Sequence, residues 1–121
     1  MPNFHKSIQD IPIFTKTYEL YKIFYGFLPF FPKRERHTLG QRCEIVLLDI
    51  LESIILAGSL SKSEKPPVLK TASIKVDVLK TLFKLGKDLK IIDNKKYEVL
   101  TQSLDEIGRM IGGWIKTTSQ I

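Results

Sequence analysis

Apolar residues recur along the chain at steps of three and four residues, which is the spacing of an α-helix. These steps of three and four residues continue through residues 69–86 and 97–114. No segment combines sustained apolar–polar alternation with hairpin turn residues, so no β-strand is predicted. The clearest row begins near the N-terminus and consists of Ile13, Thr17, Leu20, Phe24 and Phe27. The chain is therefore predicted to be all-α.

Prolines divide this helical pattern into segments. Proline breaks a helix interior but fits the first turn, so Pro29, Pro32 and the pair Pro66 and Pro67 mark boundaries. The long segment after Pro67 needs a further break, and the sequence around Asp93 supplies a helix N-cap. We predict four helices, at about residues 12–29, 33–59, 66–90 and 94–118.

The predicted connections are short, so consecutive helices should run antiparallel. The simplest arrangement is an up-down-up-down antiparallel four-helix bundle. A chain of 121 residues and 13.9 kDa has the length of one domain, and we expect residues 1–121 to form it.

Two of these helices carry more apolar surface than one bundle can bury. On a helical wheel the two apolar rows of helix 66–90 cover about 200°, against about 100° for an ordinary surface helix. The helix at 33–59 is similarly apolar. One explanation is a central helix covered by its neighbours. The other, which we favour, is self-association into a homo-oligomer, because monomers rarely expose large apolar patches. The second row of helix 66–90 contains Ile74, Val78, Leu82, Leu85 and Leu89.

Composition narrows the class of protein. Apolar residues make up 43% and charged residues 26%, as in ordinary globular chains. No apolar run approaches the roughly 20 residues of a membrane span, and the first residues lack the apolar core of a signal peptide. The single cysteine excludes an internal disulfide and fits a reducing compartment. We expect a cytoplasmic protein that does not enter the membrane.

Residue types that carry catalysis are scarce. The two histidines, His5 and His37, form no pair with metal-ligand spacing, and there is no phosphate-binding glycine loop. Cys43 lies on the apolar side of its helix, which indicates a buried structural thiol. We expect no catalytic residue, no metal and no cofactor, and predict that the protein is not an enzyme.

Positive charge is concentrated in one part of the sequence. The formal net charge is +6, and residues 60–96 alone carry +6. This excess favours contact with a polyanion, while the alternative is a solvated lysine face that confers solubility. Nine of the twelve aromatic residues precede residue 32 at core spacing, which favours packing over base stacking. The candidate nucleic-acid-binding residues are Lys33, Arg34, Arg36, Arg42, Lys70, Lys75, Lys80, Lys84, Lys87 and Lys90.

The C-terminal half contains a more specific signature. Three parts of the sequence resemble the accessory variability determinant (Avd) proteins of diversity-generating retroelements. They are the segment EIGRMIGGWI, the stretch from Ala72 to Leu85, and the residues Ile55, Ala57 and Gly58. The wider family includes proteins encoded by intervening sequences in bacterial large-subunit ribosomal RNA genes. The resemblance covers residues 18–117 and is most specific at Glu106, Gly108, Arg109, Gly112 and Trp114.

This resemblance implies a four-helix bundle that assembles into a basic homopentameric barrel. It further implies an accessory protein that binds nucleic acid and the retroelement reverse transcriptase and supports mutagenic cDNA synthesis. The signature residues are expected to be structural, with Glu106 and Arg109 able to pair and the glycines allowing close helix approach. The alternative function is an oligomeric protein-interaction scaffold without direct nucleic-acid binding. A small enzyme or metal site is disfavoured.

Overall fold

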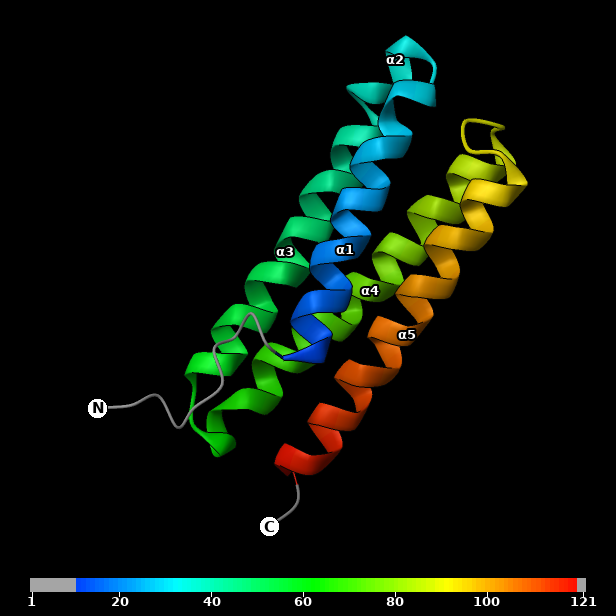
Figure 1. Cartoon of the computed structure of the whole chain (residues 1–121). Helices are drawn as coiled ribbons and strands as arrows, with labels where there is room; N and C mark the ends of the chain where they lie inside the picture. The colour runs from blue at the N-terminus through cyan, green and yellow to red at the C-terminus, as the bar shows by residue number, and fades with distance from the viewer. Residues whose placement is uncertain (1–10, 120–121) are drawn as a thin grey trace.

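The computed structural model describes residues 11–119, and every regular element in this range is helical. Four long helices form the body of the molecule (Figure 1). The remaining elements are a four-residue α-helix and two 3₁₀ turns at the connections. In chain order the elements are α1 (Pro12–Phe27), η2 (Leu28–Phe30), α2 (Lys33–Arg36), α3 (Leu39–Ser59), η3 (Lys62–Glu64), α4 (Lys65–Asp88) and α5 (Asn94–Ser119).

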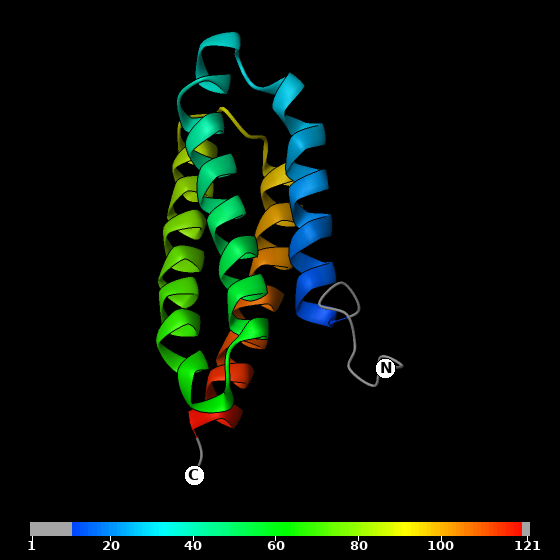
Figure 2. The same cartoon turned by 90° about the vertical axis from the view of Figure 1, so that its left-hand side faces the viewer.

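The four long helices pack side by side with alternating direction (Figures 1 and 2). Helices α1 and α4 each contact both α3 and α5, so the four helices close into a ring around one core. This arrangement confirms the prediction of a four-helix bundle. Within residues 11–119, none of the helices has an apolar stretch of the length that a membrane crossing needs.

The core is built by the apolar rows that the sequence pattern singled out. Phe24 of α1 stacks on Phe83 of α4, with ring centroids 5.8 Å apart, and meets the edge of Phe31 at 5.8 Å. The buried hydroxyl of Thr17 donates a hydrogen bond to the carbonyl oxygen of Ile13 at 2.8 Å, so this polar group is satisfied within α1. The row in α5 is equally buried and contains Leu100, Leu104, Ile107 and Ile111.

The predicted helix over residues 33–59 is wrong at its start. The structure divides it into α2 and α3, with a break at His37 and Thr38. All four residues of α2 are charged, so α2 has no apolar row that could continue the buried row of α3. The apolar pattern begins at Leu39, where α3 begins. The predicted helix over residues 12–29 also ends early, at Phe27, and a 3₁₀ turn containing Pro29 follows.

The turn between α4 and α5 folds back onto the end of α4. The amides of Ile91 and Ile92 both donate to the carbonyl oxygen of Gly86, at 2.8 and 3.1 Å. Lys90 adopts a left-handed backbone with φ of 62°, the only positive φ in the described segment. Ile92 is buried against Gly86, where a Cβ atom would lie 2.7 Å from the Ile92 Cδ1 atom. A side chain at position 86 would therefore force Ile92 to shift, so the turn as folded favours glycine there.

The second apolar row of α4 lies at the surface of the bundle. Ile74 and Leu89 are 64% and 61% exposed, and Val78 and Leu85 are also exposed. Leu82 is half-buried. Since α4 occupies one corner of the ring and has an exposed outward face, it is not the central helix covered by its neighbours that the first explanation required. The exposed residues Ile74, Val78, Leu85 and Leu89 are called the outer apolar row below.

Replacement of Gly86 by alanine tests the packing of the turn. The added methyl group would overlap Ile92 and press on Leu39. We expect the free energy of unfolding to fall by about 1–2 kcal/mol, because overpacking outweighs the gain in helix propensity. Chemical denaturation measures this change. Gly113→Ala is the control, since nothing lies within 4 Å of its Cβ position. It should raise stability by up to about 1 kcal/mol, and a stabilised Gly86→Ala variant would contradict the packing described.

Candidate nucleic-acid interface

The topology brings two basic segments, distant in sequence, to the same end of the bundle. Helix α2 and the turn between α4 and α5 both lie at the end where α1 finishes and α3 begins (Figures 1 and 2). Phe30 and Phe31, from the α1–α2 connection, line one groove together with Lys87 and Lys90. We call this region the basic end, made of Lys33, Arg34, Arg36, Arg42, Lys84, Lys87, Lys90, Lys95 and Lys96.

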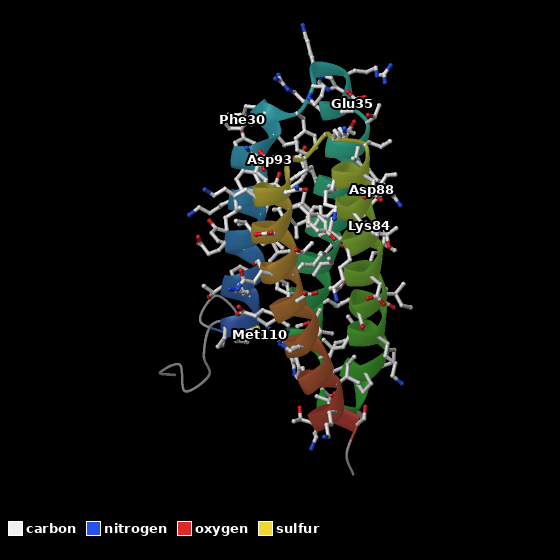
Figure 3. All side chains as sticks on the ribbon, turned by 90° about the vertical axis from the view of Figure 1, so that its right-hand side faces the viewer. Phe30, Glu35, Lys84, Asp88, Asp93 and Met110 are labelled. Atoms are coloured by element: carbon white, nitrogen blue, oxygen red, sulfur yellow. The ribbon has the colours of Figure 1, made fainter. Side chains whose placement is uncertain are left out.

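Seven of the ten predicted nucleic-acid-binding residues belong to the basic end. The other three do not: Lys70 lies in the second turn of α4, near the opposite end, and Lys75 and Lys80 lie along its middle. Figure 3 shows the acidic neighbours Glu35, Asp88 and Asp93 near the basic end, with Lys84 on α4. The candidate residues thus form one cluster at the end and a separate row along the side of α4.

The lysines along α4 are held by groups of the same chain. Lys75 pairs with Asp49 of α3 at 3.0 Å, and Lys80 pairs with Asp105 of α5 at 3.1 Å. Lys84 bonds Asp88 on its own helix at 2.9 Å, which raises the pKa of the lysine. The Lys87 ammonium lies 4.6 Å from the centre of the Tyr97 ring. The predicted ridge of Lys80, Lys84 and Lys87 therefore consists of cations that already have partners.

The two arginines of α2 also have partners. Arg36 donates from Nε to the carbonyl oxygen of Phe31 at 3.1 Å and from Nη2 to that of Pro29 at 2.7 Å. This fork ties α2 to the preceding turn, so Arg36 has a structural task in addition to its charge. Arg34 pairs with Glu35 at 3.1 Å.

Three predicted cations at the basic end have neither an ion pair, nor a side-chain hydrogen bond, nor a ring contact within the described chain. Lys33, Arg42 and Lys90 are all exposed, and none has a carboxylate within 4.0 Å. Such charges can contact phosphate without first breaking an internal pair. They come from α2, α3 and the α4–α5 turn respectively, which only the fold places at one end.

A groove of about 660 Å³ lies at the basic end, between the α1–α2 connection and the α4–α5 turn. Phe30, which is 69% exposed, forms part of its wall. The Lys96 ammonium lies 4.6 Å from the centre of the Phe30 ring and 2.9 Å from the Asp93 carboxylate. Asp93 caps α5 by accepting the Lys96 amide at 2.8 Å, and these two bonds lower the pKa of its carboxyl group.

Three aromatic residues depart from the expectation that the aromatics before residue 32 pack in the core. Tyr18 and Tyr25 on α1 are exposed, and Phe30 is the most exposed of the three. Sequence reasoning missed Phe30 although a signal was present. It lies between Pro29 and Pro32, where the chain cannot keep a helical period, so the core-spacing argument did not apply to it.

The signature of α5 connects helices within the subunit. Glu106 pairs with Lys16 of α1 at 3.2 Å, and no ion pair joins it to Arg109 within the described chain, although their spacing would allow one. Gly108 meets Val76 of α4 at an ordinary 3.6 Å from its Cβ position. Gly112 has nothing within 4 Å there, so close helix approach inside the bundle does not explain it. Trp114 lies 5.7 Å below the Lys65 ammonium.

The remaining candidate chemistry gives no second site. Cys43 is fully buried, as predicted, and burial raises the pKa of its thiol to about 12. Three or more His, Cys, Asp or Glu side chains do not gather as possible metal ligands anywhere in residues 11–119. His37 is exposed on the short connection before α3, and His5 lies outside the described residues.

The fold defines the chain as a four-helix-bundle protein. A family model described as bAvd-like matches residues 12–118, nearly the whole described chain. The chain therefore belongs to the bAvd-like family, which confirms the resemblance inferred from the α5 signature. Proteins of this family are generally accessory and non-catalytic. A search of curated proteins gave no match.

Lys90→Gly tests the strained backbone of the α4–α5 turn. A left-handed conformation costs a residue with a Cβ atom about 1–2 kcal/mol, and glycine avoids this cost at this helix-end position. We expect the free energy of unfolding to rise by about 0.5–1 kcal/mol, measured by chemical denaturation. Lys90→Gln is the matched control, because it removes the same charge but keeps the strain. Equal stability of the two variants would contradict this account.

Proposed function

We propose that this protein is a non-enzymatic accessory factor of a diversity-generating retroelement. It binds nucleic acid and the retroelement reverse transcriptase and supports mutagenic cDNA synthesis. The observation that carries the nucleic-acid part is the convergence of cations from α2, α3 and the α4–α5 turn at one end of an Avd-type bundle. The polymerase supplies the chemistry, and this protein holds the template or product in the cytoplasm.

The charge arrangement favours contact with the phosphate backbone and not with the bases' edges. Lysines and arginines neutralise phosphates and release counterions, which gives affinity with little sequence preference. Lys33, Arg42 and Lys90 are the cations best placed for this role, because no carboxylate, carbonyl oxygen or aromatic ring of the described chain holds their side chains. RNA and DNA share this backbone chemistry.

The outer apolar row supports assembly of several copies. Ile74, Val78, Leu85 and Leu89 form exposed apolar surface on one side of α4. Burial of this row against another subunit would remove it from water and stabilise a homo-oligomer. Five subunits follow from the family resemblance. With helices aligned, a ring of copies would present several basic ends on one side, which multiplies the attraction for a polyanion.

The role of the basic end in binding nucleic acid is tested by comparing two sets of three neutralised cations. Lys33→Gln, Arg42→Gln and Lys90→Gln together remove three unpaired charges, while Lys16→Gln, Lys75→Gln and Lys80→Gln remove three paired ones outside the basic end. We expect the first set to lower the slope of log affinity against log salt by about two to three, near one per lost phosphate contact. The second set should change it by less than about one. Fluorescence anisotropy with labelled RNA over a salt series measures both.

An equal effect of the two sets would contradict the assignment of the basic end. Absence of any binding by the unmodified protein at physiological salt would favour the alternative, an oligomeric interaction scaffold. The observation in favour of that alternative is the internal pairing of Lys75, Lys80 and Lys84. In that case the lysines would serve mainly solubility and helix packing.

The role of the outer apolar row in assembly is tested by placing a charge in it. Ile74→Glu places a charge in the middle of this row and should dissociate the oligomer into smaller species, because a buried unpaired carboxylate is costly. Light scattering coupled to gel filtration measures the mass. Val99→Glu on α5 is the control, since Val99 is also exposed but lies beside Phe27 of α1. A monomeric unmodified protein, or an unchanged mass for Ile74→Glu, would contradict the proposal.

A further inference from the structure

We propose that the groove at the basic end binds an unpaired nucleotide, with its base stacked on Phe30 and its phosphates facing Lys87 and Lys90. The partner would then be single-stranded nucleic acid or an unpaired loop. This inference rests on the proposed function, because it names the class of nucleic acid that the basic end accepts.

Phe30 is an exposed aromatic ring on a fixed backbone. Arg36 donates to the carbonyl oxygens of both neighbours, Pro29 and Phe31, and thereby braces the peptide segment from two sides. Phe31 is buried against Phe24 and anchors the segment in the core. A large apolar ring that is 69% exposed and held in this way presents a ready surface for a flat partner.

Charge in the groove suits a nucleotide. Its lining includes three lysines, Lys87, Lys90 and Lys96, against two aspartates, Asp88 and Asp93. Both aspartates are already bonded to lysine, Asp88 to Lys84 and Asp93 to Lys96. The aspartates therefore oppose a phosphate less than bare carboxylates would, and Lys90 has no acidic partner to give up.

The opposite wall is rigid as well. The carbonyl oxygen of Gly86 accepts two amides of the turn, and Ile92 closes against Gly86 in the core. The left-handed backbone of Lys90 follows from this closure. A lysine at a position where glycine would be less strained is the pattern expected when the side chain has a task. Both walls are thus organised before a ligand arrives, which reduces the entropy lost on binding.

The geometry favours an unpaired base over a duplex. Bases inside a duplex stack on their neighbours and offer only their edges, whereas an unpaired base can stack on an aromatic side chain. A volume of about 660 Å³ is in the range of sites that hold small organic ligands. Phosphate contacts alone would not distinguish the two forms, so Phe30 is the residue on which this discrimination depends.

Phe30→Ala tests the inference against two probes at the same salt concentration, an oligothymidine of about twenty nucleotides and a duplex of equal length. We expect affinity for the single strand to fall by about five- to tenfold, the effect of losing one stacked base. Affinity for the duplex should stay within about twofold. Tyr18→Ala is the matched control, because Tyr18 is also exposed and also has a lysine, Lys22, 5.8 Å from its ring centre. It should change neither affinity.

Phe30→Trp provides a second measurement. This variant should keep single-strand affinity, and its added tryptophan emission should be quenched by the single strand and not by the duplex. Equal losses for both probes in Phe30→Ala, no loss for either, or no selective quenching in Phe30→Trp would overturn the inference while leaving the proposed function intact. Failure of the unmodified protein to bind either probe would instead overturn the proposed function.

Discussion

The basic end depends on close packing against two helical glycines. Gly40, at the start of α3, leaves room for Leu28 and the Glu35 carbonyl oxygen, while Gly86, near the end of α4, leaves room for Ile92. A Cβ atom at either position would lie under 3.0 Å from a neighbouring side chain. Both connections can therefore fold tightly onto the bundle. Without that packing, the charges of the two connections would not be held beside one another.

The lysines and arginines that have similar sequence surroundings fall into two groups: those that pair with a carboxylate of the same chain, and those that do not. Lys75 and Lys80 join α4 to α3 and α5, so their charge contributes to the contacts between helices. Exposed pairs of this kind are each worth about 1 kcal/mol or less, so they do not hold the bundle together. Their consequence is electrostatic, because each paired lysine presents less net charge to a distant polyanion than Lys90 does.

Much of the fold could be predicted from the sequence, because the apolar rows have a strict helical period. The ends of α4 and α5 lie within two residues of the prediction. The break at His37 and Thr38 was missed because charged α2 has helical propensity but no core to pack on. The site was predicted less well. Residue spacing places Lys33 and Lys90 in separate segments, and only the antiparallel ring brings those segments together, while internal pairs such as Lys80 with Asp105 depend on helix register.

Because the number of long helices is even, the first one begins and the last one ends toward the same side of the bundle. Helix α1 begins at Pro12 and α5 ends at Ser119; the end of α5 lies opposite the basic end, and α1 begins partway along the bundle on that side (Figure 1). Helix α4, with 24 residues, is about 36 Å long, and this length separates the two ends. A fluorescent label on a side chain near the end of α5 would leave the basic end open. The two ends of the subunit therefore differ, and a surface, a bead or a second protein can be attached at the end opposite the basic end.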